Sequence, residues 1–343
     1  MNTTTHSKTQ NNQLDSLVLL RGIAVLMVCF CHFGNALSNG HRFANLFEAF
    51  HNYGNYGVHV FFVISGFIIP FSLFKGKYGV NDYHRFLYKR FLRLHPPYLA
   101  ALVLTLVIMY FSYKIRHIPF PENATSVLQS LIYLHTPGDN PVFWTLLVEA
   151  QYYLFIGIFY LLLMKNSKIA YFIVMPILLI LSKSINQYFS LQLYFVFFFI
   201  GNVGYMIYTK NGSRKMNFIA LICLLIFTAC FYEIPAFISS LFTISFILLI
   251  NMPVNKAFKF VGTISYSVYL IHFPIGTKLI NLIKPRINLS YSWLLFTITL
   301  VVTLIISWVF YKTFEVFSEN LSKNVKYKAI FKRQMKIGIN ENT

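Results

Sequence analysis

An arginine and a histidine lie inside the first apolar stretch of the chain, LDSLVLLRGIAVLMVCFCHF. Arg21 and His32 are eleven residues apart, which on an α-helix is three turns plus about 20°, so they share one face, roughly 16 Å apart. Ionisable side chains at membrane depth are expensive and usually functional. The pair therefore predicts a pathway with a permanent cation and a titratable imidazole. The structural alternative is that Arg21 snorkels to the membrane surface while His32 bonds a neighbouring carbonyl.

A cluster of basic residues opens the third apolar stretch, FLYKRFLRLHPPYLAAL. Arg90 and Arg93 are spaced i, i+3 and so lie on the same helical face, close to Arg85 and Lys89. Paired guanidinium groups suit bidentate recognition of phosphate. The cluster therefore predicts an anion site, although basic residues at this place also fit a plain orientation signal.

Three further polar residues lie within apolar stretches. Glu149 is in PVFWTLLVEAQYYLF and needs a partner, for which His32, Arg21 or a hydroxyl are candidates. Ser65 lies in GVHVFFVISGF and His272 in ISYSVYLIHFP; both are candidate lining residues, with helix packing and a satisfied core histidine as the alternatives. The sequence carries no nucleotide-binding glycine motif, no hydrolase motif and no His/Cys cluster with metal-ligand spacing.

These residues must be positioned by membrane helices. Only 11% of the 343 residues are charged, against about 25% in soluble domains, while 57% are hydrophobic and the mean hydropathy is +0.59. This excludes a soluble enzyme, a disordered chain and a fibrous protein. The net charge of +19 resides mostly in short loops, so it predicts membrane orientation rather than binding to nucleic acid. The four cysteines lie in apolar segments and are interpreted as packing residues.

The hydropathy predicts an all-α fold, a polytopic membrane bundle of about ten transmembrane helices. A helix needs roughly 20 apolar residues to cross a bilayer. The expected spans are Leu14–Leu37, Tyr56–Phe74, Phe86–Ser112, Phe143–Met164, Ile169–Ser184, Leu191–Thr209, Met216–Tyr232, Ala236–Asn251, Gly262–Ile283 and Tyr291–Phe314.

The loop charges predict the orientation. With both termini in the cytoplasm, inner lysines and arginines outnumber outer ones by roughly three to one, as the positive-inside rule requires. We expect a cytoplasmic tail at residues 1–13, a membrane domain at 14–317 and a basic tail at 318–343 on the anionic inner leaflet.

Taken together and in order, five motifs resemble the acyltransferase 3 family over about Leu14 to Phe314. They are LDSLVLLRGIAVLMVCFCHF, GVHVFFVISGF, FLYKRFLRLHPPY, FWTLLVEAQYY and ISYSVYLIHFP. The family consists of integral-membrane acyltransferases, many of which O-acetylate bacterial surface polysaccharides, and its core of ten membrane helices agrees with the spans above. Some members carry a fused periplasmic hydrolase-like domain, whereas this chain resembles the single-domain type.

The resemblance implies roles for individual residues. Its first-span arginine and histidine fall on Arg21 and His32, its arginine motif on Arg90 and Arg93, and its tryptophan–glutamate motif on Trp144 and Glu149. It implies acyl-coenzyme A as the donor, entering from the cytoplasm, and an essential His32. The expected assignments are catalytic His32 and Glu149, donor-binding Arg21, Arg90 and Arg93, and lining Ser65, Trp144 and His272, with no metal.

The expected function is transfer of an acyl group, most often acetyl in the family, from acyl-coenzyme A to a hydroxyl of a surface glycan. O-antigen, capsule and exopolysaccharide are the candidate acceptors, and the bacterial inner membrane is the expected location. No permanently bound cofactor is expected; the partners are the bilayer, acyl-coenzyme A and the glycan, and the sequence predicts no oligomeric state. The alternative is a secondary transporter or flippase that uses the Arg21–His32 face, although two matching halves are absent from the sequence.

Overall fold

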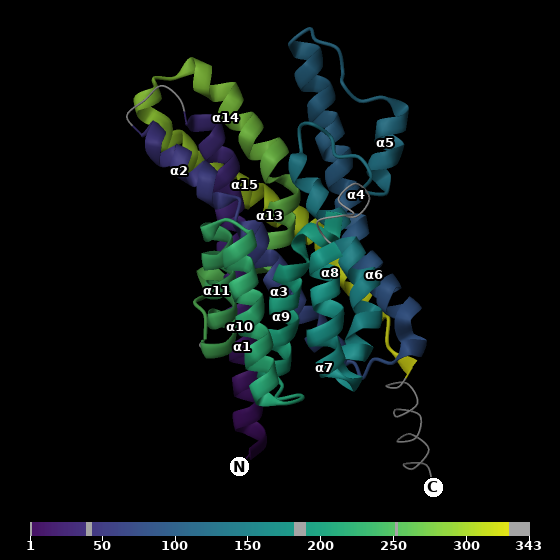
Figure 1. Cartoon of the computed structure of the whole chain (residues 1–343). Helices are drawn as coiled ribbons and strands as arrows, with labels where there is room; N and C mark the ends of the chain where they lie inside the picture. Colours follow the sequence, from purple (N-terminus) through teal and green to yellow (C-terminus); the bar gives the residue numbers. More distant parts are fainter. Residues whose placement is uncertain (1, 39–42, 182–189, 251–252, 329–343) are drawn as a thin grey trace. The chain divides into compact units, whose positions relative to one another are not determined.

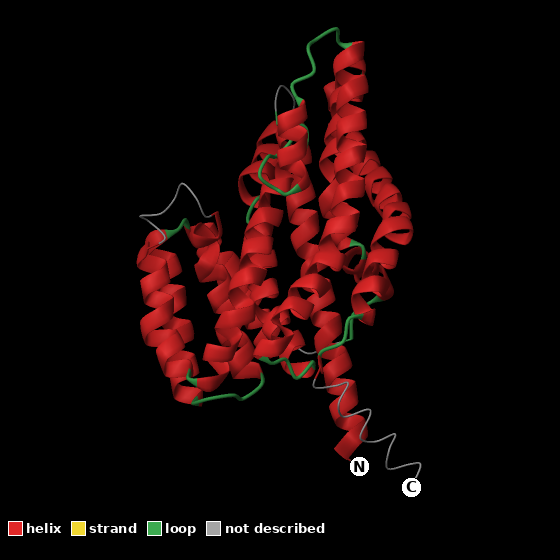
Figure 2. Ribbon diagram, turned by 90° about the vertical axis from the view of Figure 1, so that its right-hand side faces the viewer, coloured by secondary structure: helices red, strands yellow, loops and turns green. Residues whose placement is uncertain are grey.

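The chain is built from α-helices joined by short connections. A computed structural model describes residues 2–38, 43–181, 190–250 and 253–328, and these contain helices and turns without a strand (Figures 1 and 2). Seven helical segments are long and apolar enough to cross a membrane: residues 15–37, 44–75, 80–115, 141–165, 190–208, 214–231 and 289–324. Residues 167–181 and 234–249 form shorter apolar helices. The predicted polytopic helical bundle is confirmed.

Some expected spans differ in detail from the helices that form. The ninth, Gly262–Ile283, is interrupted at Ile264 and again by a π-helical turn at Phe273–Thr277 that contains Pro274. The second is preceded by an unpredicted helix, α2 (Ala44–Gly54). The ends of the fifth and eighth expected spans (182–184 and 251), and residues 329–343 of the tail, lie outside the described residues.

The helices divide into two compact units. Unit 1 comprises Met1–Phe61, Pro97–Leu147 and Leu249–Val316, and unit 2 comprises Phe62–Pro96, Val148–Leu248 and Phe317–Thr343. Three long helices contribute to both units, because the borders fall inside α3 (Gly57–Lys75), α4 (Tyr83–Ile115) and α6 (Trp144–Lys165).

Unit 1 is organised around α1 (Asn2–Leu37), against which α2 and α12 (Lys256–Thr263) pack. Small residues permit this close packing: a Cβ on Gly262 would lie 1.9 Å from the carbonyl oxygen of Val18. The other helices of the unit are α5 (Ala124–Leu131), α13 (Ser265–His272), α14 (Lys278–Ile283) and α15 (Ser292–Phe310).

Aromatic side chains fill the space between α1, α2 and α15. Phe47 is fully buried, and its ring lies 5.4 Å from Phe296 and 5.1 Å from Trp293. Phe50 contacts Phe30 of α1 at 5.1 Å. Tilted ring contacts at these separations add to the effect of burial, so the aromatic face of α2 holds this helix against α1 and α15.

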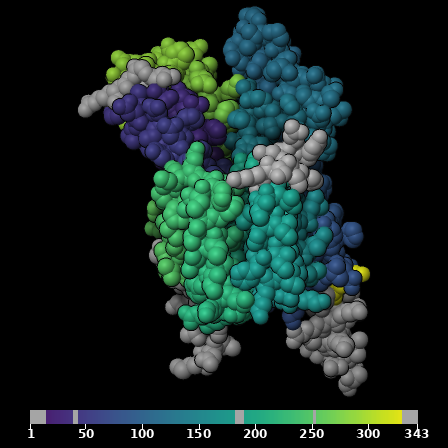
Figure 3. All heavy atoms as spheres, viewed as in Figure 1, coloured from purple at the N-terminus to yellow at the C-terminus, as the bar shows by residue number. Residues whose placement is uncertain are grey.

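Unit 2 contains the helices between α6 and residue 248, together with α16. They are α7 (Ser167–Ile169), α8 (Met175–Leu181), α9 (Phe195–Tyr208), α10 (Arg214–Phe231), α11 (Ile234–Leu249) and α16 (Val316–Asn324). Green atoms of α10 and α11 form a continuous face of this unit in Figure 3. The helix α9 is the most deeply buried, and its Gly201 lies against Gly66 and the carbonyl of Val63 on α3, where a Cβ would clash. The small residues of the second expected span therefore do allow close helix packing.

Candidate functional site

The two ionisable residues of the first span lie on one continuous helix. Arg21 and His32 both belong to α1, and both side chains are partly buried within the protein. Since the helix runs unbroken through both positions, the eleven-residue spacing places them on one face, as the sequence predicts.

A second histidine lies beside His32 within unit 1. The rings of His32 and His272 are 5.3 Å apart between centroids and are tilted by 40°. Phe273 packs edge-on against His32 at 5.1 Å, and His51 of α2 lies within electrostatic range of it. The structure thus brings together two of the predicted site residues, His32 and His272, from opposite ends of the sequence.

The position of His272 follows from the break in its helix. His272 is the last residue of α13, and Pro274 in the π-helical turn has no N–H to donate to the carbonyl of Leu270. That carbonyl instead accepts a hydrogen bond from Nδ2 of Asn140 at 2.9 Å. The turn is also tightly apposed to α1, because a Cβ on Gly276 would lie 2.2 Å from the ring of Phe33.

The hydrogen bonds of His272 fix its tautomer. Its Nδ1 lies 2.8 Å from the carbonyl oxygen of Tyr269 and 3.1 Å from that of Val268, and since both are acceptors, Nδ1 carries the proton. In the neutral ring Nε2 then has only a lone pair. The side chain is fully buried, and Nε2 has no hydrogen-bond partner among the described residues.

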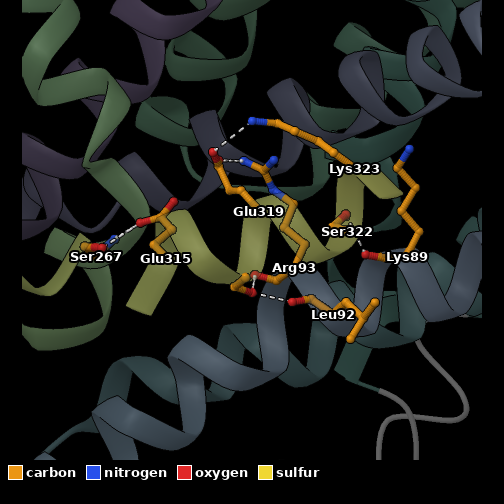
Figure 4. A network of polar contacts seen from close by, with 9 residues as sticks. Lys89, Leu92, Arg93, Ser267, Glu315, Glu319, Ser322 and Lys323 are labelled. Carbon is orange, nitrogen blue, oxygen red and sulfur yellow. Dashed lines mark hydrogen bonds and ion pairs between the residues drawn. The ribbon is translucent and has the colours of Figure 1, made fainter. Parts of the chain in front are cut away.

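The other end of α13 is held by a buried carboxylate that the sequence reasoning missed. Glu315 is 1% exposed, and its Oε2 accepts hydrogen bonds from the hydroxyl of Ser267 at 2.6 Å and from the backbone N–H of Ser267 at 3.2 Å (Figure 4). Because a carboxylate at a helix N-terminus satisfies exposed N–H groups and complements the helix dipole, Glu315 fixes the start of the short helix that ends at His272.

Trp144 begins α6 in unit 1 and is partly buried. The hydroxyls of the neighbouring Thr145 and of Tyr269 are hydrogen-bonded at 2.7 Å, and the Tyr269 hydroxyl lies 3.0 Å from the carbonyl oxygen of Val142, which can accept its proton. The tryptophan is therefore next to a hydrogen-bonded junction with α13.

In unit 2, Arg90 is buried beneath aromatic rings. Its side chain is 9% exposed, and its guanidinium lies 5.5 Å from the ring centre of Phe86 and 5.6 Å from that of Tyr153. Its Nε has no hydrogen-bond partner, and it forms no ion pair within the part of the chain that the structure describes. Glu149 lies within electrostatic range of Arg90 and offsets part of the cost of burying its charge. A buried guanidinium without a direct ion pair is nevertheless costly unless a ligand supplies one.

Glu149 belongs to the same unit, on α6. Its carboxylate accepts a short hydrogen bond from the hydroxyl of Tyr153, one helical turn later. Tyr153 therefore contacts both predicted residues. Its hydroxyl is hydrogen-bonded to Glu149, and its ring packs against the guanidinium of Arg90. Of the candidate partners of Glu149, the structure shows a hydroxyl, that of Tyr153, while pairing with His32 or Arg21 stays a prediction.

Arg93, one turn after Arg90, has a different environment. Its Nη2 lies 3.1 Å from Oε1 of Glu319 on α16, and Lys323 approaches the other oxygen of that carboxylate at 3.8 Å (Figure 4). The Arg93 side chain is 33% exposed, so this ion pair is open to solvent and to anions.

The helix α16, which carries Glu319, is hydrogen-bonded to the backbone of α4. Ser318 donates to the carbonyls of Leu92 and Arg93, and Ser322 donates to that of Lys89 at 3.0 Å (Figure 4). These bonds pin α16 to the basic start of the helix.

Further contacts continue past α16 over the same helix. The backbone N–H of Lys328 donates to Asp82 at 2.8 Å, and Arg85 donates to the carbonyl of Lys326. Tyr327 between them is 3% exposed, and its hydroxyl has no hydrogen-bond partner among the described residues. Burial raises the pKa of the Tyr327 phenol above its usual range, an effect that the Arg90 guanidinium partly offsets. The phenol therefore keeps its proton and is a hydrogen-bond donor.

Ser65 lies on α3 in unit 2 and is partly exposed. Its neighbour Gly66 makes the close contact with Phe198 of α9. Among the described residues no group of three or more His, Cys, Asp or Glu side chains could hold a metal ion.

Several residues of the candidate site were not predicted from the sequence. Glu319 and Tyr327 lie in the segment interpreted as a tail, and Glu315 lies just beyond the last expected span. A signal was present for Glu315, since an acidic residue in so apolar a chain requires a partner. Tyr153 was hidden among the 23 tyrosines of the sequence.

The comparison with known families covers the histidines and the arginine motif of these sites, whereas Glu315, Glu319 and Tyr327 lie beyond the matched residues. The model of the acyltransferase domain of the acyltransferase 3 family matches residues 14–312. No curated protein and no solved structure matches the chain. The match runs from within α1 to two residues past the end of α15 and assigns the chain to acyltransferases rather than to transporters or flippases. With its long apolar helices, the chain belongs to the acyltransferase 3 family of membrane acyltransferases.

Proposed function

We propose that this acyltransferase moves an acyl group, in the first instance acetyl, from acyl-coenzyme A to a hydroxyl of a cell-surface glycan such as O-antigen, capsule or exopolysaccharide. The observation that carries the donor assignment is Arg90, a buried guanidinium without an ion pair among the described residues. Coenzyme A brings several phosphate oxygens, and arginine is the side chain best suited to bind them.

The surroundings of Arg90 favour an anionic ligand. Lys89 and Arg93 add positive charge on the same helix, and the hydroxyl of Tyr327 is a buried donor without a partner among the described residues. A phosphate would satisfy these donors and compete with Glu319 for Arg93. Arg21, on α1 in unit 1, is proposed as a further donor-binding residue.

The chemistry is assigned to His32. The acceptor oxygen attacks the thioester carbonyl, a C–O bond forms, the C–S bond breaks, and His32 takes the hydroxyl proton and then delivers it to the departing thiolate. A thiolate is a good leaving group, so orientation and a base account for most of what the site must supply. The donor reaches the site from the cytoplasm and the glycan from the other side of the bacterial inner membrane.

The test uses the purified full chain in lipid nanodiscs. Acetyl-coenzyme A binding is measured by titration, and release of free thiol is followed with and without glycan from the native host. In parallel, mass spectrometry compares surface glycans of cells with and without the gene. A gain of one acetyl per repeat unit with coenzyme A release supports the proposal, and unchanged glycans together with absent donor binding refute it.

A further inference from the structure

We propose that His272 is the residue that positions the catalytic imidazole, with its Nε2 accepting the N–H of His32. The inference deepens the proposed function and rests on His32 acting as the base. A histidine base works best when a third group orients it, the place that a carboxylate takes in Ser–His–Asp enzymes. In unit 1, the group beside His32 is another imidazole.

The tautomer of His272 suits this role. With its proton on Nδ1 and held by two backbone carbonyls, Nε2 presents a lone pair. A lone pair accepts N–H and repels carbonyl and phosphate oxygens, so the thioester carbonyl is a poor occupant of this position. The N–H of His32 is a suitable hydrogen-bond donor to Nε2 and is supplied by the protein itself.

The geometry brings the rings within reach. Two imidazoles with centroids 5.3 Å apart can turn edge to edge so that their nitrogens meet at hydrogen-bond distance, about 3 Å. His272 is fixed by its carbonyl partners, and Pro274 and Asn140 fix the turn that follows it. Rotation of the His32 ring about its Cβ–Cγ bond is the motion required.

The consequence for catalysis follows from proton balance. His32 receives the acceptor proton on one nitrogen and becomes an imidazolium whose other N–H points at a neutral acceptor. The lone pair of His272 stabilises that cation and keeps the reactive nitrogen aimed at the hydroxyl. His272 stays neutral throughout, because the proton taken up by His32 is not passed on to it.

Two substitutions separate this role from a structural one. His272→Asn places an amide where Nδ1 lies, so it preserves the bonds to the carbonyls of Val268 and Tyr269 but lacks the acceptor at Nε2. His272→Gln places its amide near Nε2 and preserves the acceptor at the expense of the carbonyl bonds. We expect kcat to fall at least about tenfold in the Asn variant with both KM values unchanged, and to recover in the Gln variant.

A second measurement does not depend on acyl transfer. Diethyl pyrocarbonate adds an ethoxyformyl group to an unprotonated imidazole nitrogen, and peptide mass spectrometry follows its rate at His32. Because an oriented, hydrogen-bonded His32 is the stronger nucleophile, this rate is expected to fall in His272→Asn and recover in His272→Gln.

The outcomes divide clearly. The proposal is overturned if the Asn variant retains turnover and His32 reactivity, or if the Gln variant is the more impaired, because a structural anchor would depend on the carbonyl bonds. If wild-type protein transfers no acyl group while His32 reactivity follows the expected order, the proposed function fails and the histidine pair stands.

Discussion

Arg93 of α4 and Glu319 of α16 form an ion pair, with Nη2 and Oε1 separated by 3.1 Å, although the two residues lie near opposite ends of unit 2 in sequence. The carboxylate occupies the guanidinium that the family resemblance assigns to the donor. A donor phosphate at Arg93 must therefore displace Glu319 or share the guanidinium with it.

Removal of the Glu319 charge is expected to tighten donor binding. A partly exposed ion pair contributes up to about 1 kcal/mol, so Glu319→Gln should lower the KM for acyl-coenzyme A by about two- to fivefold. Initial rates at varied donor concentration measure the effect. Glu48→Gln, the same change at an exposed site on α2, serves as the control. A higher KM would show that Glu319 instead holds Arg93 in its binding conformation.

The two arginines of the motif should respond differently to lysine. Arg93→Lys keeps the charge but loses the planar fork, so the donor KM should rise with unchanged thermal stability. Arg90→Lys also loses the stacking against Phe86 and Tyr153, so both KM and melting temperature should change. Arg214→Lys, at an exposed position at the start of α10, is the reference. An unchanged donor KM in both variants would show that Arg90 and Arg93 serve only as a signal for membrane orientation.

His32→Gln should abolish most turnover while donor binding survives. Glutamine is polar and similar in size but cannot take up a proton, so kcat should fall by about 10²–10⁴. Titration with acetyl-coenzyme A and the glycan assay are performed on the same preparation, with His84→Gln at an exposed site as the control. Retained acetylation would remove His32 from the mechanism, and lost binding would make it a donor-binding residue.

The buried bond between Ser267 and Glu315 should contribute to stability. Ser267→Ala leaves a carboxylate that is 1% exposed without its 2.6 Å hydroxyl donor, which costs about 1–3 kcal/mol. Thermal unfolding in detergent measures the loss. Thr297→Ala removes an exposed hydroxyl bonded to the carbonyl of its own helix and should change little. Equal melting temperatures for the two variants would contradict the role assigned to Glu315.

The predicted orientation can be tested at two glycines. A Cβ at Gly79 or Gly138 meets nothing within 4 Å, so cysteine fits at both. In a background without native cysteines, Gly138→Cys should react with a membrane-impermeant maleimide in intact cells, and Gly79→Cys only after lysis. The reverse labelling pattern would show that the chain has the opposite orientation in the membrane.

The sequence was sufficient for the helical class and for most of the span positions, and it singled out candidate site residues whose roles stay predictions. Apolar length decides a membrane helix, and the spacing of Arg21 and His32 on one helix decides their face. The pairing of His32 with His272 was not predictable, because it depends on how α1 packs against the turn around Pro274. The role of Glu319 was missed because the charge of its segment suggested a membrane-surface tail, whereas serine hydroxyls bind that segment to α4.

The attachment of α16 to α4 also bears on how the protein is made. Ser318 and the carbonyl of Arg93 that it binds are 225 residues apart, so during synthesis the arginine motif is inserted long before its carboxylate partner exists. Until the helical segment 289–324 is complete, Arg93 lacks its counter-ion Glu319. The surroundings of Arg93 therefore reach their final form only after this segment is synthesised, and truncation within α15 should produce a protein that inserts but is assembled incorrectly around Arg93.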